Sequence, residues 1–376
     1  MQRNNLSTMK TDKQKILMAG GGSGGHVFPL LNVYEIMKKN YEVLFVGENK
    51  GKEEKWVSER GIAYRGILAG KMRRYWSWDN LVDIFKLPIG IVQSLYIINN
   101  FRPQVVFVKG GYVSLPVAIA AWMLRIPILV HESDMVMGLS NRVIGKIATK
   151  IAVSFPIGGY DSRLAKKMIY TGLPVRDWKV KSENIDVFKN NFGISNDLPV
   201  IFVTGASQGA IHINDYIFRY VDSMLEYANV IHQTGELDYE RIALLAKNKK
   251  GKGVYIVKPF LTDDFNRVMY LADMVVARSG ATTLAEISSL AKPSILIPLP
   301  TSASNHQYFN AKTFEDIGAA VMVEERDFDR INLAILIKSI LEDEERFEEM
   351  SAAAVTAMQT EGASQIINDI IVDMIK

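Results

Sequence analysis

The sequence predicts an α/β protein with two doubly wound halves. Short apolar runs rich in β-forming residues, such as KILMAG (15–20) and EVLFVG (42–47), alternate with helical patterns such as residues 28–39. Runs that are apolar on both faces are typical of a parallel sheet covered by helices. The alternation pauses in a polar, proline-containing stretch and restarts at VIFVTG (200–205). We therefore expect two α/β domains joined by a linker.

Each half contains a series of such runs in chain order. In the first half, strands are predicted over 15–20, 42–47, 105–110, 127–132 and 150–155, with a further helix over 140–149. In the second half they are predicted over 200–205, 229–235, 254–260, 274–280 and 294–300. The apolar spacing of residues 363–376 predicts an amphipathic helix. The expected domains are a disordered leader (1–14), a first domain (15–172), a linker (173–198), a second domain (199–350) and C-terminal helices (351–376) that could return to the first domain.

Composition restricts the classes of partner. The first 175 residues hold 24 basic and 12 acidic side chains, whereas the remainder holds 20 basic and 29 acidic ones. A basic half favours an anionic partner, such as nucleic acid, a phospholipid surface or a phosphorylated substrate.

The absence of cysteine excludes disulfides and thiolate metal sites, and it favours a reducing compartment. No apolar run reaches the roughly 18 residues that a spanning helix requires.

A glycine-rich turn follows the first predicted strand. Gly20, Gly22 and Gly25 match the pattern G-x-G-x-x-G between a strand and a helix. Such a turn brings backbone N–H groups close to a phosphate, a diphosphate or a sugar. His26 follows at the start of the helix, where an imidazole that titrates near neutrality can accept a proton from a hydroxyl. The alternative is a tight turn without a ligand.

The second half repeats this arrangement. VIFVTGASQGA places Gly205, Ser207 and Gly209 between a strand and a helix, and RSGATT (278–283) occupies a second such junction. Helix N-termini of this kind stabilise negative charge. Several of them, divided between two halves, favour a diphosphate bound in a cleft between domains. Glu286, one turn inside the following helix, could hold a ribose diol, and the alternative is a solvated helix acid.

An ordered set of motifs resembles the MurG family of bacterial glycosyltransferases. GGGSGGHVFP, KGGYVSLP, HESD, GLSN, TGLPVR, GASQGA, RSGATTLAEI and NHQYFNA occur in this order between about residues 15 and 370. The resemblance implies the GT-B fold, with two Rossmann-like domains. It also implies inverting transfer of N-acetylglucosamine from UDP-GlcNAc to the muramoyl 4-hydroxyl of lipid I, which gives lipid II for peptidoglycan synthesis. The implied location is the cytoplasmic face of the cell membrane. The implied partners include other cell-wall synthesis proteins but no nucleic acid, and no cofactor is expected.

The resemblance also assigns binding residues. Ser23, Gly24 and Gly25 lie near both sugars, Arg176 contacts the nucleotide, and Leu261 meets the uracil through its backbone. The remaining donor residues are Ser207, Gln208, Ala281, Thr282, Thr283, Leu284, Ala285, Glu286 and Gln307. The acceptor side comprises Gly110, Gly111, Tyr112 and Asn141.

For catalysis, inverting transfer requires a base for the acceptor hydroxyl and stabilisation of the departing UDP. His26 is the first candidate base, followed by Glu132 and Asp134. The chain departs from the family at two places. Many members have HEQN where this chain has HESD, so Asp134 replaces an amide. Many members also have two glutamines where this chain has His306-Gln307. The only D-x-D sequence, Asp327 to Asp329, is interpreted as a polar helix start, so no metal is expected.

A stretch of mixed basic and aromatic character is expected to contact an anionic membrane. Residues 70–101 combine bases with aromatics and are apolar almost all round. The residues proposed for membrane contact are Lys71, Arg73, Arg74, Trp76, Trp78 and Phe85, with Arg142, Lys146 and Lys150 as further basic candidates. The alternative is ordinary core packing.

Other classes of function remain open at this stage. A dinucleotide-dependent oxidoreductase would explain one glycine turn but not the second. A glycolipid synthase or a UDP-sugar epimerase would use the same architecture. A non-catalytic lipid-binding protein would not need a histidine at the turn.

Overall fold

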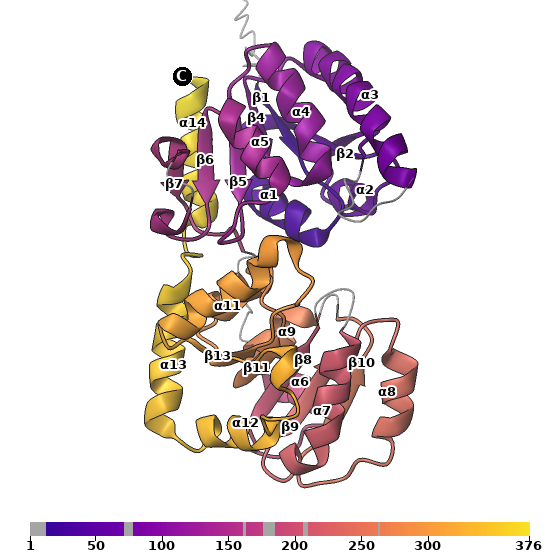
Figure 1. Cartoon of the computed structure of the whole chain (residues 1–376), viewed down its shortest axis with the longest axis vertical. Coiled ribbons are helices and arrows are strands. Elements are labelled where there is room, and N and C mark those ends of the chain that lie inside the picture. Colours follow the sequence, from indigo (N-terminus) through magenta and orange to yellow (C-terminus); the bar gives the residue numbers. More distant parts are fainter. Residues whose placement is uncertain (1–12, 71–77, 161–162, 176–184, 206–209, 262–263) are drawn as a thin grey trace, which may run out of the picture. The chain divides into compact units, whose positions relative to one another are not determined.

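The computed structural model describes residues 13–70, 78–160, 163–175, 185–205, 210–261 and 264–376 (Figure 1), with the side chains of 78–85, 159 and 186 excluded. The chain divides into two compact units. Unit 1 comprises residues 1–132, 139–152 and 364–376, and unit 2 comprises 133–138 and 153–363. Unit 1 is therefore built from the first part of the chain together with its last helix.

The first sheet has seven strands in the order β3-β2-β1-β4-β5-β6-β7. Its strands are β1 (Gln14–Ala19), β2 (Tyr41–Glu48), β3 (Ala63–Ile67), β4 (Val105–Val108), β5 (Ile128–Glu132), β6 (Lys150–Val153) and β7 (Met168–Tyr170). Strands β1 to β5 pair in parallel, with Ile16 opposite Val43 on one side and Val105 on the other. The order of strands reverses at β1, so the turn after β1 lies where ligands bind in open sheets of this kind.

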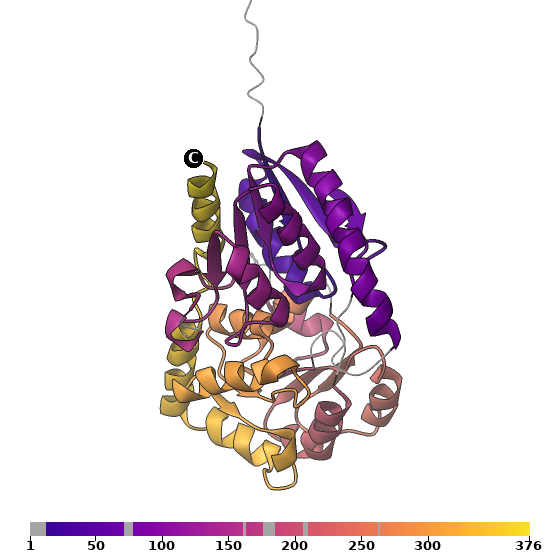
Figure 2. The same cartoon turned by 45° about the horizontal axis from the view of Figure 1, so that its top comes forward.

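The helices of unit 1 are α1 (Gly24–Met37), α2 (Glu53–Ser58), α3 (Trp78–Phe101), α4 (Gly111–Met123), α5 (Leu139–Ile147) and α14 (Ala363–Ile375). Helices α3, α4 and α5 pack side by side, as both views show (Figures 1 and 2). Strand β1 is fully buried from Ile16 to Ala19, and Ile367 and Ile371 of α14 are fully buried as well. Helix α14 thus contributes to the packing of unit 1.

The second sheet is wholly parallel, in the order β10-β9-β8-β11-β12-β13. Its strands are β8 (Val200–Thr204), β9 (Asn229–Gln233), β10 (Tyr255–Lys258), β11 (Met274–Ala277), β12 (Ser294–Leu296) and β13 (Ala320–Met322). The helices are α6 (Ile185–Asn191), α7 (Ile211–Met224), α8 (Tyr239–Ala246), α9 (Phe265–Leu271), α10 (Ala281–Ser289), α11 (His306–Asp316), α12 (Leu333–Leu341) and α13 (Glu344–Ala357). The described residues also contain the 3₁₀ turns η1 (Ile157–Gly159), η2 (Ala165–Lys167), η3 (Ala303–Asn305) and η4 (Glu325–Asp327).

Helices cover both faces of the second sheet. Alternate residues of β8 point to opposite faces, so Phe202 packs with α10 and α13 whereas Ile201 packs with α7 and α12. Double coverage explains why β11 (MVVA), in the middle of the sheet, is apolar and buried at every position. The predicted fold class is confirmed in each unit.

Three strands were not predicted, namely β3, β7 and β13. Strand β3, AYRGI, lies at a sheet edge and is buried only at Ile67. It therefore lacks the continuous apolar run that marks the central strands. Within the described residues, no helix is both long and apolar enough to cross a membrane.

Candidate functional site

The turn between β1 and α1 presents a serine and a histidine together. Ser23 has extended backbone angles at the N-terminus of α1, and its Oγ lies 3.0 Å from His26 Nδ1. Gly22 and Ser23 are exposed, whereas His26 is half-buried. The turn therefore holds an imidazole at the carboxyl end of the central strand, with one of its nitrogens facing a hydroxyl.

The glycines of this turn are required by contacts within the protein. A Cβ on Gly21 would lie 2.5 Å from Glu53 Oε1, and one on Gly22 would lie 2.6 Å from the ring of Tyr112. Gly22 also has a φ of +85°, which disfavours any other residue. The sequence interpretation invoked close approach to a ligand. Close contacts with Glu53 and Tyr112 are a further reason for glycine at these two positions.

A second turn reaches the same histidine. Gly110 and Gly111 precede and open α4 with φ values of +90° and +77°. A Cβ on Gly111 would lie 3.5 Å from His26 Nδ1, and one on Gly110 would overlap the carboxamide of Asn141. The structure thus brings the predicted acceptor-side glycines against both His26 and Asn141.

Glu132 is held in a fixed orientation at the end of β5. Asn141 Nδ2 donates to Glu132 Oε2 over 2.9 Å and to the carbonyl oxygen of His131 over 3.3 Å. Glu132 is only 4% exposed and Asn141 only 5% exposed. Unit 1 therefore gathers His26, Gly110, Gly111, Asn141 and Glu132 into one connected group.

The predicted donor segment of unit 2 forms the start of α10. Gly280 is its N-cap, and the first N–H groups of the helix have no partner in a preceding turn. Leu284 and Ala285 are fully buried in the core. Side-chain contacts with a ligand are therefore restricted to the half-buried members of the segment, which include Thr282, Thr283 and Glu286.

Asp134 belongs to unit 2, where Asn310 holds it. Asn310 Nδ2 donates to Asp134 Oδ1 over 2.9 Å and to the carbonyl oxygen of Ser279 over 3.1 Å, while its Oδ1 accepts from the N–H of Met135. Asn310 is fully buried. Asn310 lies in the NHQYFNA motif, but no feature of that motif predicts this role. Only the fold brings it to a residue 176 positions away.

Hydrogen bonds within the protein limit which atoms of Leu261 and Gln307 are available for the predicted donor contacts. The N–H of Leu261 donates to Gln233 Oε1 over 2.9 Å, so its carbonyl is the backbone group left for a base edge. Gln307 Oε1 accepts from the N–H of Leu299 over 3.0 Å. This bond orients the carboxamide of Gln307 so that its NH₂ group is directed away from Leu299.

Arg278 has a structural role that the motif RSGATT did not reveal. It is 7% exposed, donates to the carbonyl oxygens of Ile297 and Pro298, and pairs with Glu325 over 2.5 Å. It thereby fixes the segment that leads into α10. The D-x-D residues are also paired, Asp327 with Arg330 and Asp329 with Arg219.

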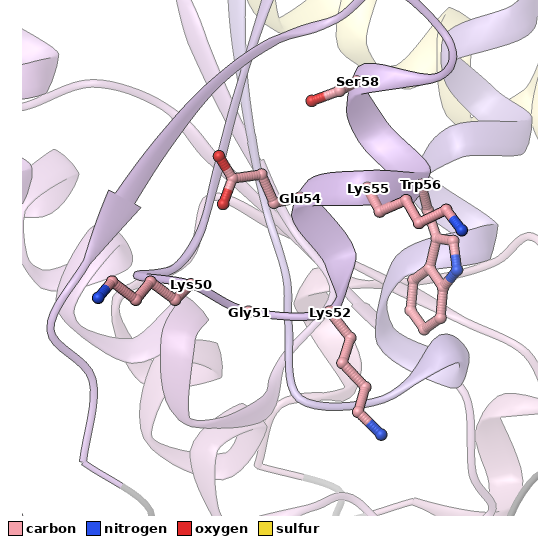
Figure 3. A pocket seen from close by; sticks show the side chains of 7 residues that line it. All are labelled: Lys50, Gly51, Lys52, Glu54, Lys55, Trp56 and Ser58. Carbon is pink, nitrogen blue, oxygen red and sulfur yellow. The ribbon is translucent and has the colours of Figure 1, made fainter.

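A hollow of about 650 Å³ lies on α2 of unit 1, apart from these residues. Its lining comes entirely from residues 50–58 (Figure 3). The side chains of Lys50, Lys52 and Lys55 point in different directions there, so they do not converge on one ligand.

Several predicted residues lie outside the part of the chain that the structure describes. These are Arg176, Ser207, Gln208, Lys71, Arg73, Arg74 and Trp76. Trp78 and Phe85 lie on α3, but their side chains are not described.

Two parallel sheets, with glycine-rich turns at the carboxyl ends of their strands, are typical of enzymes that act on nucleotide-linked substrates. Residues 16–153 match the model of the glycosyltransferase family 28 N-terminal domain, and residues 200–370 match that of the family 28 C-terminal domain. A relative from Listeria welshimeri is 34% identical over 366 residues, covering 95% of this chain and 99% of the relative. One from Caldicellulosiruptor saccharolyticus is 33% identical, covering 92% and 94%. Both are named UDP-N-acetylglucosamine--N-acetylmuramyl-(pentapeptide) pyrophosphoryl-undecaprenol N-acetylglucosamine transferase. The chain therefore belongs to glycosyltransferase family 28 and, within it, to the MurG family.

Solved structures agree on the fold. The chain resembles MurG of Acinetobacter baumannii with a TM-score of 0.75 and 24% identity, over 96% of this chain and 99% of that one. It also resembles a UDP-GlcNAc 2-epimerase from Neisseria meningitidis with a TM-score of 0.67 and 16% identity, over 96% and 100%. Similarity at this level of identity concerns the architecture, so the GT-B fold predicted from the sequence is confirmed.

Proposed function

We propose that this chain transfers N-acetylglucosamine from UDP-GlcNAc to the muramoyl 4-hydroxyl of lipid I, giving lipid II for cell-wall synthesis. The observation that carries the proposal is the full-length similarity to curated relatives that bear this activity in their name. An activity of this kind serves cell shape and cell division, because both depend on new peptidoglycan.

His26 is the proposed general base. Its Nδ1 faces Ser23, so we assign removal of the proton from the acceptor hydroxyl to Nε2. Attack of the resulting oxygen on the anomeric carbon breaks the bond to the UDP oxygen and inverts the centre. The departing diphosphate gains stability from the N–H groups at the start of α10.

Glu132 and Asp134 receive lesser roles. The Glu132 carboxylate accepts a hydrogen bond from Asn141 and is almost fully buried, which favours orientation of the acceptor pocket over proton transfer. Asp134 is bound by Asn310 and replaces an amide that is common in the family. We propose that it accepts a hydrogen bond from a hydroxyl of the donor sugar.

Incubation with radiolabelled UDP-GlcNAc and a short-chain lipid I analogue tests the reaction. The label should move to the analogue in a ratio of one to one with released UDP. Conversion of UDP-GlcNAc to its 2-epimer without transfer would instead favour the epimerase alternative.

We further propose that unit 1 docks on an anionic membrane through α3 and the end of α4. Ile89, Val92 and Tyr96 are 47%, 66% and 72% exposed, and their spacing places them on one face of α3. Trp122 at the end of the adjacent α4 is 56% exposed. Exposed apolar and aromatic side chains near basic ones are typical of interfacial binding.

Arg125, just after α4, is exposed, and the exposed Arg142 and Lys146 lie on the adjacent α5. The predicted Lys71, Arg73 and Arg74 precede α3 in the chain. Each basic residue near an anionic leaflet contributes about 1 kcal/mol. Localisation at the cytoplasmic face of the membrane follows from this proposal and from the lipid-linked acceptor.

Vesicle sedimentation tests the docking surface. Val92→Glu with Tyr96→Glu should release the protein from anionic vesicles, and Lys71→Glu with Arg73→Glu and Arg74→Glu should do the same. Ile335→Glu on α12 of unit 2, where Ile335 is 67% exposed, is the matched control and should sediment like wild type. Wild-type sedimentation of both the Val92/Tyr96 variant and the Lys71/Arg73/Arg74 variant would show that this surface does not dock on the membrane.

A further inference from the structure

The ring of Tyr112 supports the glycine-rich turn from one side. It occupies the space that a side chain on Gly22 would need, with its Cε1 2.6 Å from that Cβ position. The Tyr112 hydroxyl donates to Glu48 Oε2 over 2.5 Å. A carboxylate on β2 is therefore connected, through one aromatic ring, to the residue that precedes Ser23.

Glu48 is itself anchored by its backbone. Its N–H donates to Glu53 Oε1 over 2.7 Å, and its carbonyl accepts from the Tyr64 hydroxyl over 2.7 Å. In the sheet it lies opposite Ile67 of β3. The backbone of Glu48 is thus held by residues of both β3 and α2. Because the Glu48 side chain starts from a fixed backbone position, its hydrogen bond restrains the position of the Tyr112 ring.

We propose that Glu48 is a positioning residue, which holds the Tyr112 ring against Gly22 and thereby fixes the turn that carries Ser23 and His26. The inference rests on the proposed function of His26 as the base. Proton abstraction depends on sub-ångström placement of the imidazole, since small displacements of a reacting group reduce the rate strongly. Glu48 touches neither substrate in this account and acts only through Tyr112.

The Tyr112 phenol stays protonated around neutral pH. Burial raises the pKa of the Tyr112 phenol, and the bond to Glu48 raises it further. The phenol therefore remains a hydrogen-bond donor. A carboxylate accepts such a bond more strongly than a neutral oxygen does.

Kinetics of four variants test the proposal. Tyr112→Phe and Glu48→Ala should each lower kcat roughly tenfold, as expected for a lost charge-assisted hydrogen bond, with the KM for UDP-GlcNAc unchanged. Glu48→Gln retains an acceptor oxygen and should recover most of the loss. The double variant should lose no more than either single one, because both changes remove the same bond. Glu54→Ala, an exposed carboxylate on the neighbouring α2, is the control and should behave like wild type.

Amide hydrogen exchange of the peptide covering 17–30 provides a readout apart from activity. Exchange should speed up in Tyr112→Phe and Glu48→Ala but not in Glu54→Ala. Unchanged exchange, or additive losses of kcat in the double variant, would overturn the positioning role. Faster exchange together with near-normal turnover of His26→Ala would instead overturn the proposed base while the link between Glu48 and the turn stands.

Discussion

At the scale of single residues, His26 lies where two glycine turns meet. Ser23 faces Nδ1 of its ring, and the position of a Cβ on Gly111 lies 3.5 Å from the same nitrogen. Apart from Ser23, Gly24 and Gly25, the residues assigned to the donor belong to unit 2. A change at His26 should therefore affect the chemical step and leave donor binding intact.

His26→Ala should lower turnover by about two to four orders of magnitude, which is the usual effect of losing a general base. Affinity for UDP, measured by calorimetry, should remain close to that of wild type. Near-normal turnover would exclude His26 as the base.

Gln307 should govern discrimination between sugar epimers. Its Oε1 already accepts from Leu299, so its NH₂ group is the part offered to a hydroxyl of the donor sugar. Gln307→Ala and Gln307→Glu should both lose the preference for UDP-GlcNAc over its 4-epimer, because each removes that NH₂ group. Gln307→Glu retains the oxygen that Leu299 needs, so it controls for local structure. A collapse of UDP affinity in Gln307→Glu would show that the residue is structural.

At the scale of elements, β9 and α7 are joined by a buried polar network. Asn214 Nδ2 donates to Asp238 over 2.7 Å, so Asn214 Oδ1 is the acceptor for His232 Nε2, which lies 3.0 Å away. His232 Nδ1 in turn accepts from the Tyr255 hydroxyl over 2.8 Å. Arg241 completes the network by pairing with Asp238. The bonds fix His232 as the neutral imidazole that donates from Nε2.

This network makes the stability of unit 2 depend on pH. Burial lowers the pKa of His232 to about 3, well below its ordinary value of 6.5. Between these values the unfolded chain binds a proton that the folded chain does not, so the free energy of unfolding falls as the pH falls. The slope is about 1.4 kcal/mol per pH unit. The Arg241 hydrogen bond lowers the pKa of Asp238. Protonation of this carboxylate at still lower pH therefore reduces the free energy of unfolding further.

Urea unfolding between pH 7.5 and 4.5 measures this slope. His232→Asn should reduce it, whereas His306→Gln, which changes a less buried histidine, should retain it. The same slope in wild type and His232→Asn would assign the pH dependence to other groups.

At the scale of the whole molecule, the two units differ in charge and in proposed partner. The basic excess lies in the first 175 residues and the acidic excess in the remainder. A basic unit 1 suits an anionic membrane and a lipid diphosphate, whereas the nucleotide is assigned to helix N-termini in unit 2. We therefore expect that the donor is held without a bridging cation.

Excess chelator should accordingly leave transfer intact. Initial rates with and without EDTA, on a soluble acceptor analogue, measure this. Loss of activity that Mg²⁺ or Mn²⁺ restores would contradict the assignment and would direct attention to Asp327 and Asp329.

The sequence predicts the fold better than the contacts of the site. The continuous apolar runs of β1, β4 and β8 identify central parallel strands, because burial on both faces leaves a local signature. The three short edge or near-edge strands lack that signature. The contacts of Gly22 with Tyr112 and of Asp134 with Asn310 join residues far apart in the chain, so no local pattern reveals them. The family motifs pointed to Tyr112 and Asp134. They did not point to Glu48, which accepts from Tyr112, or to Asn310, which donates to Asp134.

The return of α14 to unit 1 has a consequence for biosynthesis. Ile367 and Ile371 are fully buried, yet they are made after all of unit 2. A ribosome therefore delivers every residue of unit 2 before it delivers the last helix of unit 1. Unit 2 can complete its core while the chain is still growing, whereas the surface that receives α14 stays uncovered until that helix has been made. Nascent unit 1 thus exposes apolar surface throughout the synthesis of unit 2.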